Sequence, residues 1–356
     1  MKTIEILTQE AIALLKALIE TPSFSSEEDQ TALLIESWFT QNGIPFQREN
    51  NNVWAFNHHF DKSKPTLLLN SHHDTVKPNQ GYTNDPFKAI VKEGKLFGLG
   101  SNDAGGCLVS LLATFVHFYQ QENLPYNLVM VASAEEESSG KKGLNSVLQH
   151  LPELDCAIVG EPTLMQLAIA EKGLLVLDVV VKGTASHAAH QNEDNPIYNA
   201  MNVIDWFKTY QFEKISDVLG PVKMTVTQVT AGKQHNVVPA ECHLVVDIRV
   251  NDCYSNTEIL ATVKSHVTAE VNPRSMHLNA SSIPLQHGLV QAGIALGRTT
   301  YGSPTLSDQS VLSCQSLKLG PGETLRSHSA DEFIFINEIE EGIQLYIKIL
   351  TDFFKK

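Results

Sequence analysis

The chain has 356 residues, which is long for one simple core and short for a multidomain assembly, so we expect one large α/β domain or two lobes. Its 40 acidic and 26 basic residues give a net charge of −14, which argues against nucleic acid as a partner. A composition of 42% hydrophobic and 19% charged residues excludes disorder as the main state.

The beginning of the chain alternates apolar and polar residues at helical spacing and lacks the unbroken apolar stretch of a signal peptide. No stretch approaches the roughly 18 consecutive apolar residues of a membrane span, so we expect a cytoplasmic protein without a membrane partner. The five cysteines are far apart and form no CxxC pair, which favours reduced thiols over disulfides or a thiolate metal site. The 14 histidines, by contrast, supply ligands and bases in quantity.

Helix and strand patterns alternate over the first part of the chain. Apolar residues at i, i+3 and i+4 predict helices over 8–20, 26–41 and 106–119. Ser25 or Ser26 is the expected cap of the second of these helices. Short apolar runs bounded by turn residues predict strands at 53–56, 66–70, 128–133 and 156–159. This alternation is typical of an α/β sheet with buried central strands.

The pattern changes beyond Lys172. The elements predicted there are a β-branched strand at 174–181, a helix at 196–210, strands at 223–229 and 242–250, and a helix at 256–270. This order is that of a small α+β sandwich. We therefore expect an inserted domain at 173–282, while residues 1–172 and 283–356 form one α/β domain that ends in a helix at 337–353.

Histidine and acidic side chains follow the predicted strands where these strands end. His72 and Asp74 follow the second strand, a run of three glutamates follows the third, and Glu161 follows the fourth. Catalytic groups of open α/β sheets gather beyond the carboxyl ends of the strands, so these side chains are site candidates. Asp74 can accept a hydrogen bond from the His72 imidazole and fix its tautomer. Taken singly, each residue also fits an ordinary loop or a solvated charge run.

Two further candidates lie in glycine-rich turns. Asp103 lies within the glycine-dense segment 98–106, which lacks the Lys-Ser or Lys-Thr pair of a P-loop, and a helix cap is its structural alternative. His328 follows the turn Gly320-Pro321-Gly322. Imidazole and carboxylate ligands without thiolate suit Zn²⁺, with Mn²⁺ or Co²⁺ also possible. Two metal ions about 3.5 to 4 Å apart need a bridging carboxylate, and Asp103 is the candidate bridge. The proposed ligand set is His72, Asp103, Glu137, Glu161 and His328.

These residues belong to motifs that follow one another along most of the chain. The motifs are HxDTV at 72–76, GxxD at 100–103, a Glu-Glu pair, VGEPT at 159–163, GxxSHAA at 183–189, NVVPA at 236–240, DIR at 247–249 and HxxDE at 328–332. In this order they resemble the co-catalytic zinc aminoacylase and carboxypeptidase family, which includes acetylornithine deacetylase and succinyl-diaminopimelate desuccinylase. The resemblance implies a zinc-exopeptidase-like three-layer α/β catalytic domain with an inserted α+β lid that also forms a homodimer.

The resemblance also implies a division of labour among the metal ligands. His72 and Glu161 would hold one of two divalent metal ions, Glu137 and His328 would hold the other, and Asp103 would bridge them. Two cations lower the pKa of a bound water toward neutrality. The expected cofactor is therefore a pair of metal ions, with Zn²⁺ first and Co²⁺ or Mn²⁺ as alternatives.

In the same resemblance, Asp74 would orient His72. Glu136 would be the general base that takes a proton from the metal-bridging water and passes it to the leaving amine. The family usually has Asp before the Glu pair, whereas this chain has three glutamates. We assign the pair to Glu136 and Glu137 and equate Glu135 with the Asp, because this keeps Gly140 closest to its usual position.

Three lid residues complete the expected site. His187, reaching from the partner subunit, would stabilise the tetrahedral oxyanion. Asn236 and Arg249 would bind the α-carboxylate of the substrate, and the planar guanidinium suits a bidentate contact with a carboxylate. A salt bridge with Asp247 is the structural alternative for Arg249.

The net charge of −14 and Glu171 favour a substrate with a cationic side chain. The segment 301–309 resembles the acetylornithine deacetylase branch, so we expect deacylation of N-acetyl-L-ornithine in arginine biosynthesis. Three alternatives stay open. The first is another acyl amino acid, such as N-succinylornithine, N-acetylcitrulline or N-succinyl-diaminopimelate; the second is a dipeptide or tripeptide as substrate; the third is a non-catalytic binding protein with the same fold.

Overall fold

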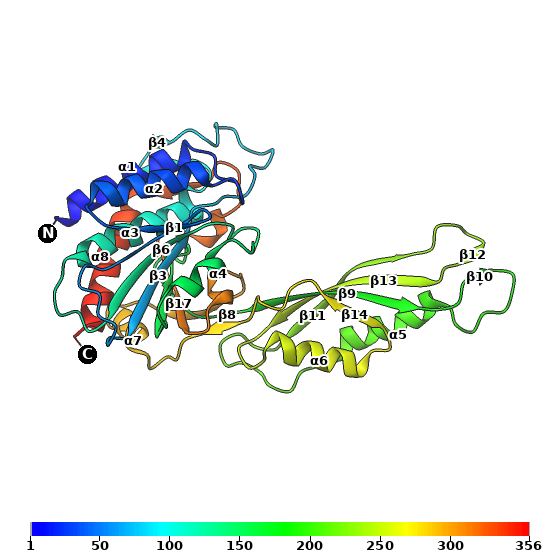
Figure 1. Cartoon of the computed structure of the whole chain (residues 1–356). Helices are drawn as coiled ribbons and strands as arrows, with labels where there is room; N and C mark the ends of the chain where they lie inside the picture. The colour runs from blue at the N-terminus through cyan, green and yellow to red at the C-terminus, as the bar shows by residue number, and fades with distance from the viewer. Residues whose placement is uncertain (1, 356) are drawn as a thin grey trace. The chain divides into compact units, whose positions relative to one another are not determined.

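The computed structural model describes residues 2–355 and divides the chain into two compact units (Figure 1). Unit 1 consists of Met1–Ile169, Ser282–Tyr301 and Ser307–Lys356, and unit 2 of Ala170–Ser281 and Gly302–Leu306. The lid and dimerisation roles expected for residues 173–282 stay predictions.

Unit 1 is built on a mixed sheet. Its strands lie side by side in the order β1 (Gln47–Glu49), β2 (Asn52–Phe56), β6 (Asn127–Ser133), β3 (Thr66–His72), β7 (Cys156–Val159), β17 (Gln315–Lys318) and β8 (Leu167–Glu171). Two shorter strands, β15 (Ser281–Ser282) and β16 (Thr300–Ser303), pair with β8. A separate sheet consists of β18 (Phe333–Phe335), β5 (Lys95–Phe97) and β4 (Ile90–Lys92). The neighbours β6, β3, β7 and β17 run parallel, so their carboxyl ends meet at one edge of the sheet.

Both faces of this sheet are covered. One face packs against α1 (Ile4–Ile19), α2 (Asp29–Gln41), α3 (Gly106–Tyr119), α7 (Gly288–Ala295) and α8 (Ile336–Phe353) (Figure 1). Leu67 and Leu69 of β3 belong to that core, whereas Leu68 packs on the other face with Trp54 and with Val147 of the short helix α4 (Leu144–Val147). Successive side chains of a strand point to opposite faces, and burial on both faces explains the uninterrupted apolar run of β3.

The predicted cap of α2 is wrong. The N-cap residue is Glu28, and its side chain makes no capping hydrogen bond. Ser25 instead donates to Oδ2 of Asp74 at 2.7 Å, and Ser26 donates to Oε1 of Glu135 at 2.7 Å. The loop before α2 is therefore bound to two acidic residues beyond the ends of β3 and β6.

Unit 2 is an antiparallel sheet with helices on one face. The strand order is β11 (Lys223–Ala231), β13 (Glu241–Val250), β9 (Gly173–Lys182) and β14 (Glu270–Pro273), and α5 (Pro196–Thr209) and α6 (Asn256–His266) share its apolar core. A further pair, β10 (Ser186–His187) and β12 (Val237–Val238), lies beyond one end of this sheet (Figure 1).

The helix predicted at 256–270 is too long. It begins as expected, with a capping box between Ser255 and Glu258, but α6 ends at His266. Val267 is extended, and the next residues enter β14, which pairs with β9. Pairing at the sheet edge decides the conformation of this β-branched segment, a contact that local helical spacing does not reveal.

None of the helices described between residues 2 and 355 combines the length and the apolar content needed to cross a membrane.

Candidate functional site

His72 is the last residue of β3, and its side chain is only 1% exposed. Its Nδ1 lies 3.0 Å from the main-chain oxygen of Asp74, which can only accept, so Nδ1 carries a proton whether the ring is neutral or charged. Its Nε2 has no hydrogen-bond partner among the described residues. This atom faces Asp103 Oδ1 at 3.4 Å, Glu161 Oε1 at 3.6 Å and Glu136 Oε2 at 3.9 Å. The surrounding carboxylates raise the pKa of His72 well above its usual value in spite of burial, and the same concentration of negative charge favours a divalent cation between these groups.

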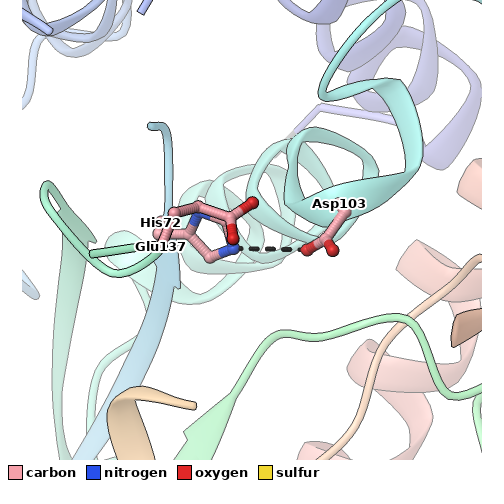
Figure 2. A group of neighbouring side chains, drawn as sticks. All are labelled: His72, Asp103 and Glu137. Carbon is pink, nitrogen blue, oxygen red and sulfur yellow. Dashed lines mark ion pairs between the residues drawn. The ribbon is translucent and has the colours of Figure 1, made fainter. Parts of the chain in front are cut away.

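Asp103 faces two histidines with its two carboxylate oxygens. It lies in the turn η1 (Ser101–Gly105) that leads into α3. Oδ1 lies 3.4 Å from Nε2 of His72, and Oδ2 lies 3.6 Å from Nε2 of His328. Figure 2 shows His72 and Asp103 turned toward each other. The same nitrogen of His328 lies 3.0 Å from Oε2 of Glu137, and this contact raises the pKa of His328 to about 9 despite partial burial. One carboxylate thus lies between two histidines, each of which has a second acidic neighbour.

The glutamate run after β6 is held by Asp74. The Asp74 carboxylate accepts hydrogen bonds from the main-chain N–H of Glu136 at 3.0 Å and of Glu137 at 3.1 Å. Glu135 has a left-handed backbone with φ +54°, and its carboxylate accepts from Ser26 and from the main-chain N–H of Lys142. The three glutamates therefore differ: Glu136 and Glu137 lie near the two histidines, and Glu135 binds the surrounding loops.

Burial among like charges perturbs these acids. Burial raises the pKa of Glu136 well above its usual value and that of Glu161 to about 8; the charge of His72 opposes both shifts, and neighbouring carboxylates add to them. The pKa of Asp103 is lowered, because its contacts with His72 outweigh the effect of burial. The cations near these carboxylates are the imidazoles and, beside Glu161, the ammonium group of Lys318, and divalent metal ions would neutralise further negative charge.

The donor atoms fit such ions. His72, Asp103 and Glu137 bring ligand atoms within 4.8 Å of one another, and so do His72, Glu136 and Glu161. All donors are imidazole nitrogens or carboxylate oxygens, which suit Zn²⁺, Mn²⁺ or Co²⁺. Together with the unpartnered Nε2 of His72, these donors fit a divalent metal ion, while the predicted division of the ligands between two ions stays a prediction.

Two buried acids near the centre were not assigned a role from the sequence. Glu332 accepts hydrogen bonds from three main-chain N–H groups around Asp103, and Asp308 lies with Oδ2 2.5 Å from the Ser133 hydroxyl at the end of β6. Burial raises the pKa of Glu332 to about 8 and that of Asp308 to about 6. Glu332 closes the HxxDE motif that contains His328, which was a usable signal. Asp308 lies in a segment without a recognisable ligand pattern.

The expected oxyanion residue His187 lies in unit 2. It is exposed at the end of β10, where it pairs with Val237 of β12. The main-chain oxygen of Asn236 accepts from Ala188 N at 3.0 Å, so His187 and Asn236 are neighbours. These two predicted residues are brought together within one unit.

Arg249 lies elsewhere in unit 2. Its guanidinium makes a bidentate contact with Asp247, at 2.9 and 3.1 Å, which is the structural alternative anticipated for this residue. Arg249 lies eight positions along β13 from Glu241, the end of the strand near β12, a span of about 26 Å at the usual rise of a strand. One copy of unit 2 therefore does not bring Arg249 and Asn236 to the same carboxylate.

Comparison with known proteins agrees with this geometry. Residues 68–352 match the model of peptidase family M20/M25/M40. The chain belongs to this family. Members of this family are hydrolases that act on amide bonds. The family and the α/β fold expected from the sequence are confirmed.

Two similar proteins carry different substrate names. The chain is 28% identical over 382 residues to an acetylornithine deacetylase of Salmonella heidelberg, covering 96% of this chain and 97% of that protein. It is 23% identical over 374 residues to a succinyl-diaminopimelate desuccinylase 2 of Ruegeria sp., with 95% and 93% covered.

Two solved structures share the fold. An M20 family metallo-carboxypeptidase from Sulfolobus solfataricus superposes with a TM-score of 0.75 at 16% identity, covering 98% of this chain and 100% of that one. A dinuclear metal-binding peptidase of the M20 family from Bacillus subtilis gives a TM-score of 0.75 at 16% identity, with 99% of both chains covered.

Proposed function

We propose that this hydrolase removes the acyl group from an N-acyl amino acid with the help of two divalent metal ions. The observation that carries the proposal is Asp103, whose two oxygens lie toward His72 at 3.4 Å and toward His328 at 3.6 Å. In this proposal His72 and Glu161 would hold one ion, Glu137 and His328 would hold the other, and Asp103 would contribute a ligand oxygen to each. Zn²⁺ is the first candidate on the chemistry of the donors.

Glu136 is the proton carrier in this mechanism. When bound, the ions polarise the scissile carbonyl and make water at the site more acidic. The carboxylate of Glu136 accepts a proton from the attacking water and returns it to the nitrogen of the leaving amine. Burial raises the pKa of Glu136, and a carboxylate with a raised pKa has a higher affinity for the transferred proton. Asp74 supports this step by holding the main chain of Glu136.

N-acetyl-L-ornithine, an intermediate of arginine biosynthesis, is the leading substrate. The similarity to an acetylornithine deacetylase over 96% of the chain supports it. Glu171, which was expected to favour a cationic side chain, is fully buried, so only the overall charge of −14 still speaks for such a substrate.

A second candidate is an N-succinyl amino acid, which carries an additional carboxylate. Lys223 is the cross-strand partner of Arg249. Burial lowers the pKa of Lys172, and the charges of Lys223 and Arg249 lower it further, so the three cations lie near one another with Asp247 as counter-charge. A cationic cluster of this kind suits a substrate with a second anionic group.

The proposal includes a homodimer formed through unit 2. β11 is a nine-residue edge strand with Val229 57% exposed, and α5 exposes Tyr198 and Met201 at 67% and 63%. The opposite edge strand, β14, is short and ends in Pro273, so it is the poorer pairing edge. Two copies would also allow Asn236 of one and Arg249 of the other to act on one substrate.

The test is a substrate panel with metal-free and metal-reloaded protein. We expect amine release from N-acetyl-L-ornithine to be faster than from the other compounds in the panel. These are N-acetyl-L-citrulline, N-succinyl-L-ornithine, N-succinyl-diaminopimelate, a dipeptide and a tripeptide. Hydrolysis of the peptides alone would replace the proposal with a peptidase. No turnover of any compound by the metal-loaded protein would refute it and favour a binding role.

A further inference from the structure

Glu332 holds the segment that carries Asp103. Its side chain is buried, and Oε1 accepts hydrogen bonds from the main-chain N–H of Asn102 at 2.8 Å and of Asp103 at 2.9 Å. Oε2 accepts from Gly100 N at 3.0 Å, and the main-chain oxygen of Glu332 accepts from Gly98 N at 3.0 Å. Both the main chain and the carboxylate of one residue therefore bind one short turn.

This turn has no cap of its own. The residue preceding η1 is Gly100, in the left-handed region with φ +75°, and it offers no side-chain capping hydrogen bond. Main-chain N–H groups at the start of a helical turn lack partners within the helix. The carboxylate of Glu332 satisfies three of them from 229 to 232 residues away in the sequence.

The other side of Asp103 is bound by the same loop. His328, four residues before Glu332, has its Nε2 3.6 Å from Oδ2 of Asp103. Asp331 ties this loop down, because its Oδ1 accepts from the main-chain N–H of Thr83 at 3.0 Å and of Asn84 at 2.9 Å. Residues 328–332 thus contact the side chain of Asp103 through His328 and its main chain through Glu332.

We infer that Glu332 is a positioning residue that fixes Asp103 between His72 and His328 and thereby sets the affinity for metal ions. The inference rests on the proposed metal centre and adds a residue that binds neither metal nor substrate. A hydrogen bond from Asp103 N to a fixed carboxylate limits the rotation of that peptide, so each oxygen of the Asp103 side chain stays opposite its own histidine. Partners of this kind typically change metal affinity by about 10- to 100-fold when they are removed.

The alternative is a purely structural cap, and metal affinity separates the two roles. Glu332→Gln keeps the size of the side chain but places an amide NH₂ against at least one main-chain N–H. Glu332→Asp keeps the charge and withdraws the carboxylate by one methylene. The matched control is Asp155→Asn, because Asp155 also accepts from a main-chain N–H, that of Thr66 at 2.7 Å, at the opposite end of β3.

The experiment titrates metal-free protein with Zn²⁺ against a chromophoric chelator, well below the unfolding temperature of each variant. We expect Glu332→Gln to weaken affinity by about 10- to 100-fold, Glu332→Asp to weaken it less, and Asp155→Asn to stay within about twofold of wild type. Far-ultraviolet circular dichroism establishes that each metal-free variant is folded.

Each outcome decides one point. Folded Glu332→Gln protein with wild-type Zn²⁺ affinity would overturn the inference and leave a structural cap. Failure of both Glu332 variants to fold, while Asp155→Asn folds, would overturn it as well, because Glu332 would then determine stability. Wild-type protein that binds no Zn²⁺ would instead refute the proposed metal centre itself.

Discussion

The carboxylate of Asp74 accepts a hydrogen bond from the main-chain N–H of Glu136 at 3.0 Å. Asp74 follows β3 and Glu136 follows β6, so this bond joins the ends of two parallel neighbouring strands. The residue after Glu136 donates to the same carboxylate at 3.1 Å, and the Ser25 hydroxyl does so at 2.7 Å. The turn that carries the proposed base is therefore positioned by a side chain from another strand.

Replacing Asp74 with Asn should lower kcat/KM by about 10- to 100-fold, because an amide offers only one oxygen to these donors. Steady-state kinetics and bound-metal analysis of the same preparation provide the measurement. Ser25→Ala is the matched control, since it removes one donor and leaves both main-chain contacts in place. Equal activity of Asp74→Asn and wild type would show that the turn carrying Glu136 keeps its conformation without the Asp74 carboxylate.

Replacing Glu136 with Gln should lower kcat by about 10²- to 10⁴-fold with little change in metal content, because only the proton carrier is lost. Glu135→Gln should mainly lower the unfolding temperature, since Glu135 binds Ser26 and Lys142. The comparison tests the register of the three glutamates. A large loss of kcat in Glu135→Gln, with Glu136→Gln active, would move the general base by one position.

Replacing Asp103 with Asn should reduce the bound metal below the roughly two ions per chain expected for a co-catalytic pair. Both oxygens of Asp103 lie within 3.6 Å of a histidine nitrogen, so the change affects both positions. Elemental analysis gives the stoichiometry. Adding Zn²⁺ at about 100 times its dissociation constant should stabilise wild type by about 2.7 kcal/mol, and the variant by less. Asp178→Asn, in unit 2, should match wild type in both measurements.

Replacing Lys172 with Met should distinguish the two substrate candidates. If the cluster of Lys172, Lys223 and Arg249 binds a second carboxylate, KM for N-succinyl-L-ornithine should rise roughly tenfold, the value of a lost charge-assisted hydrogen bond. KM for N-acetyl-L-ornithine should change much less. Equal increases for both substrates would mean that the cluster does not recognise the acyl group.

Replacing Val229 with Lys should weaken the proposed dimer, because a charge on an exposed edge strand opposes pairing with another strand. Sedimentation velocity over a range of concentrations measures the association. Val91→Lys is the control, since Val91 is also exposed, at 48%, on a strand of unit 1. A wild-type protein that is monomeric and fully active would contradict both the dimer and a role for His187 across subunits.

The sequence predicted most accurately the positions of residues that lie next to strands with a strong local apolar pattern. His72 and Glu161 became site candidates because each lies two residues beyond a predicted strand, and parallel neighbours bring such ends together. It predicted poorly what depends on distant partners. Ser25 and Ser26 fit a local helix cap, yet their hydroxyls bind Asp74 and Glu135, which lie 49 and 109 residues further along the chain.

The same physical limit applies to the lid residues. The motifs containing Asn236 and Arg249 predicted a shared role but gave no distance between them, and the register of β13 and β9 places Arg249 opposite Leu174, at the end of the sheet remote from β12. Most of the ten-residue strand β13 lies between Asn236 and Arg249, although the family resemblance assigns both residues to one substrate carboxylate. Only pairing between strands reveals such a separation.

The position of β17 has a consequence for the order in which the protein folds. β17 lies between β7 and β8, although about 160 residues separate it from β7 in the chain. Most of unit 2 is one continuous segment, so it can fold while the rest of the chain is still being synthesised. The main sheet is complete only after β17 has been synthesised. Until β17 is synthesised, the edge of β7 that pairs with it has no strand partner, and His328, which follows β17, is the last of the proposed ligands to be made.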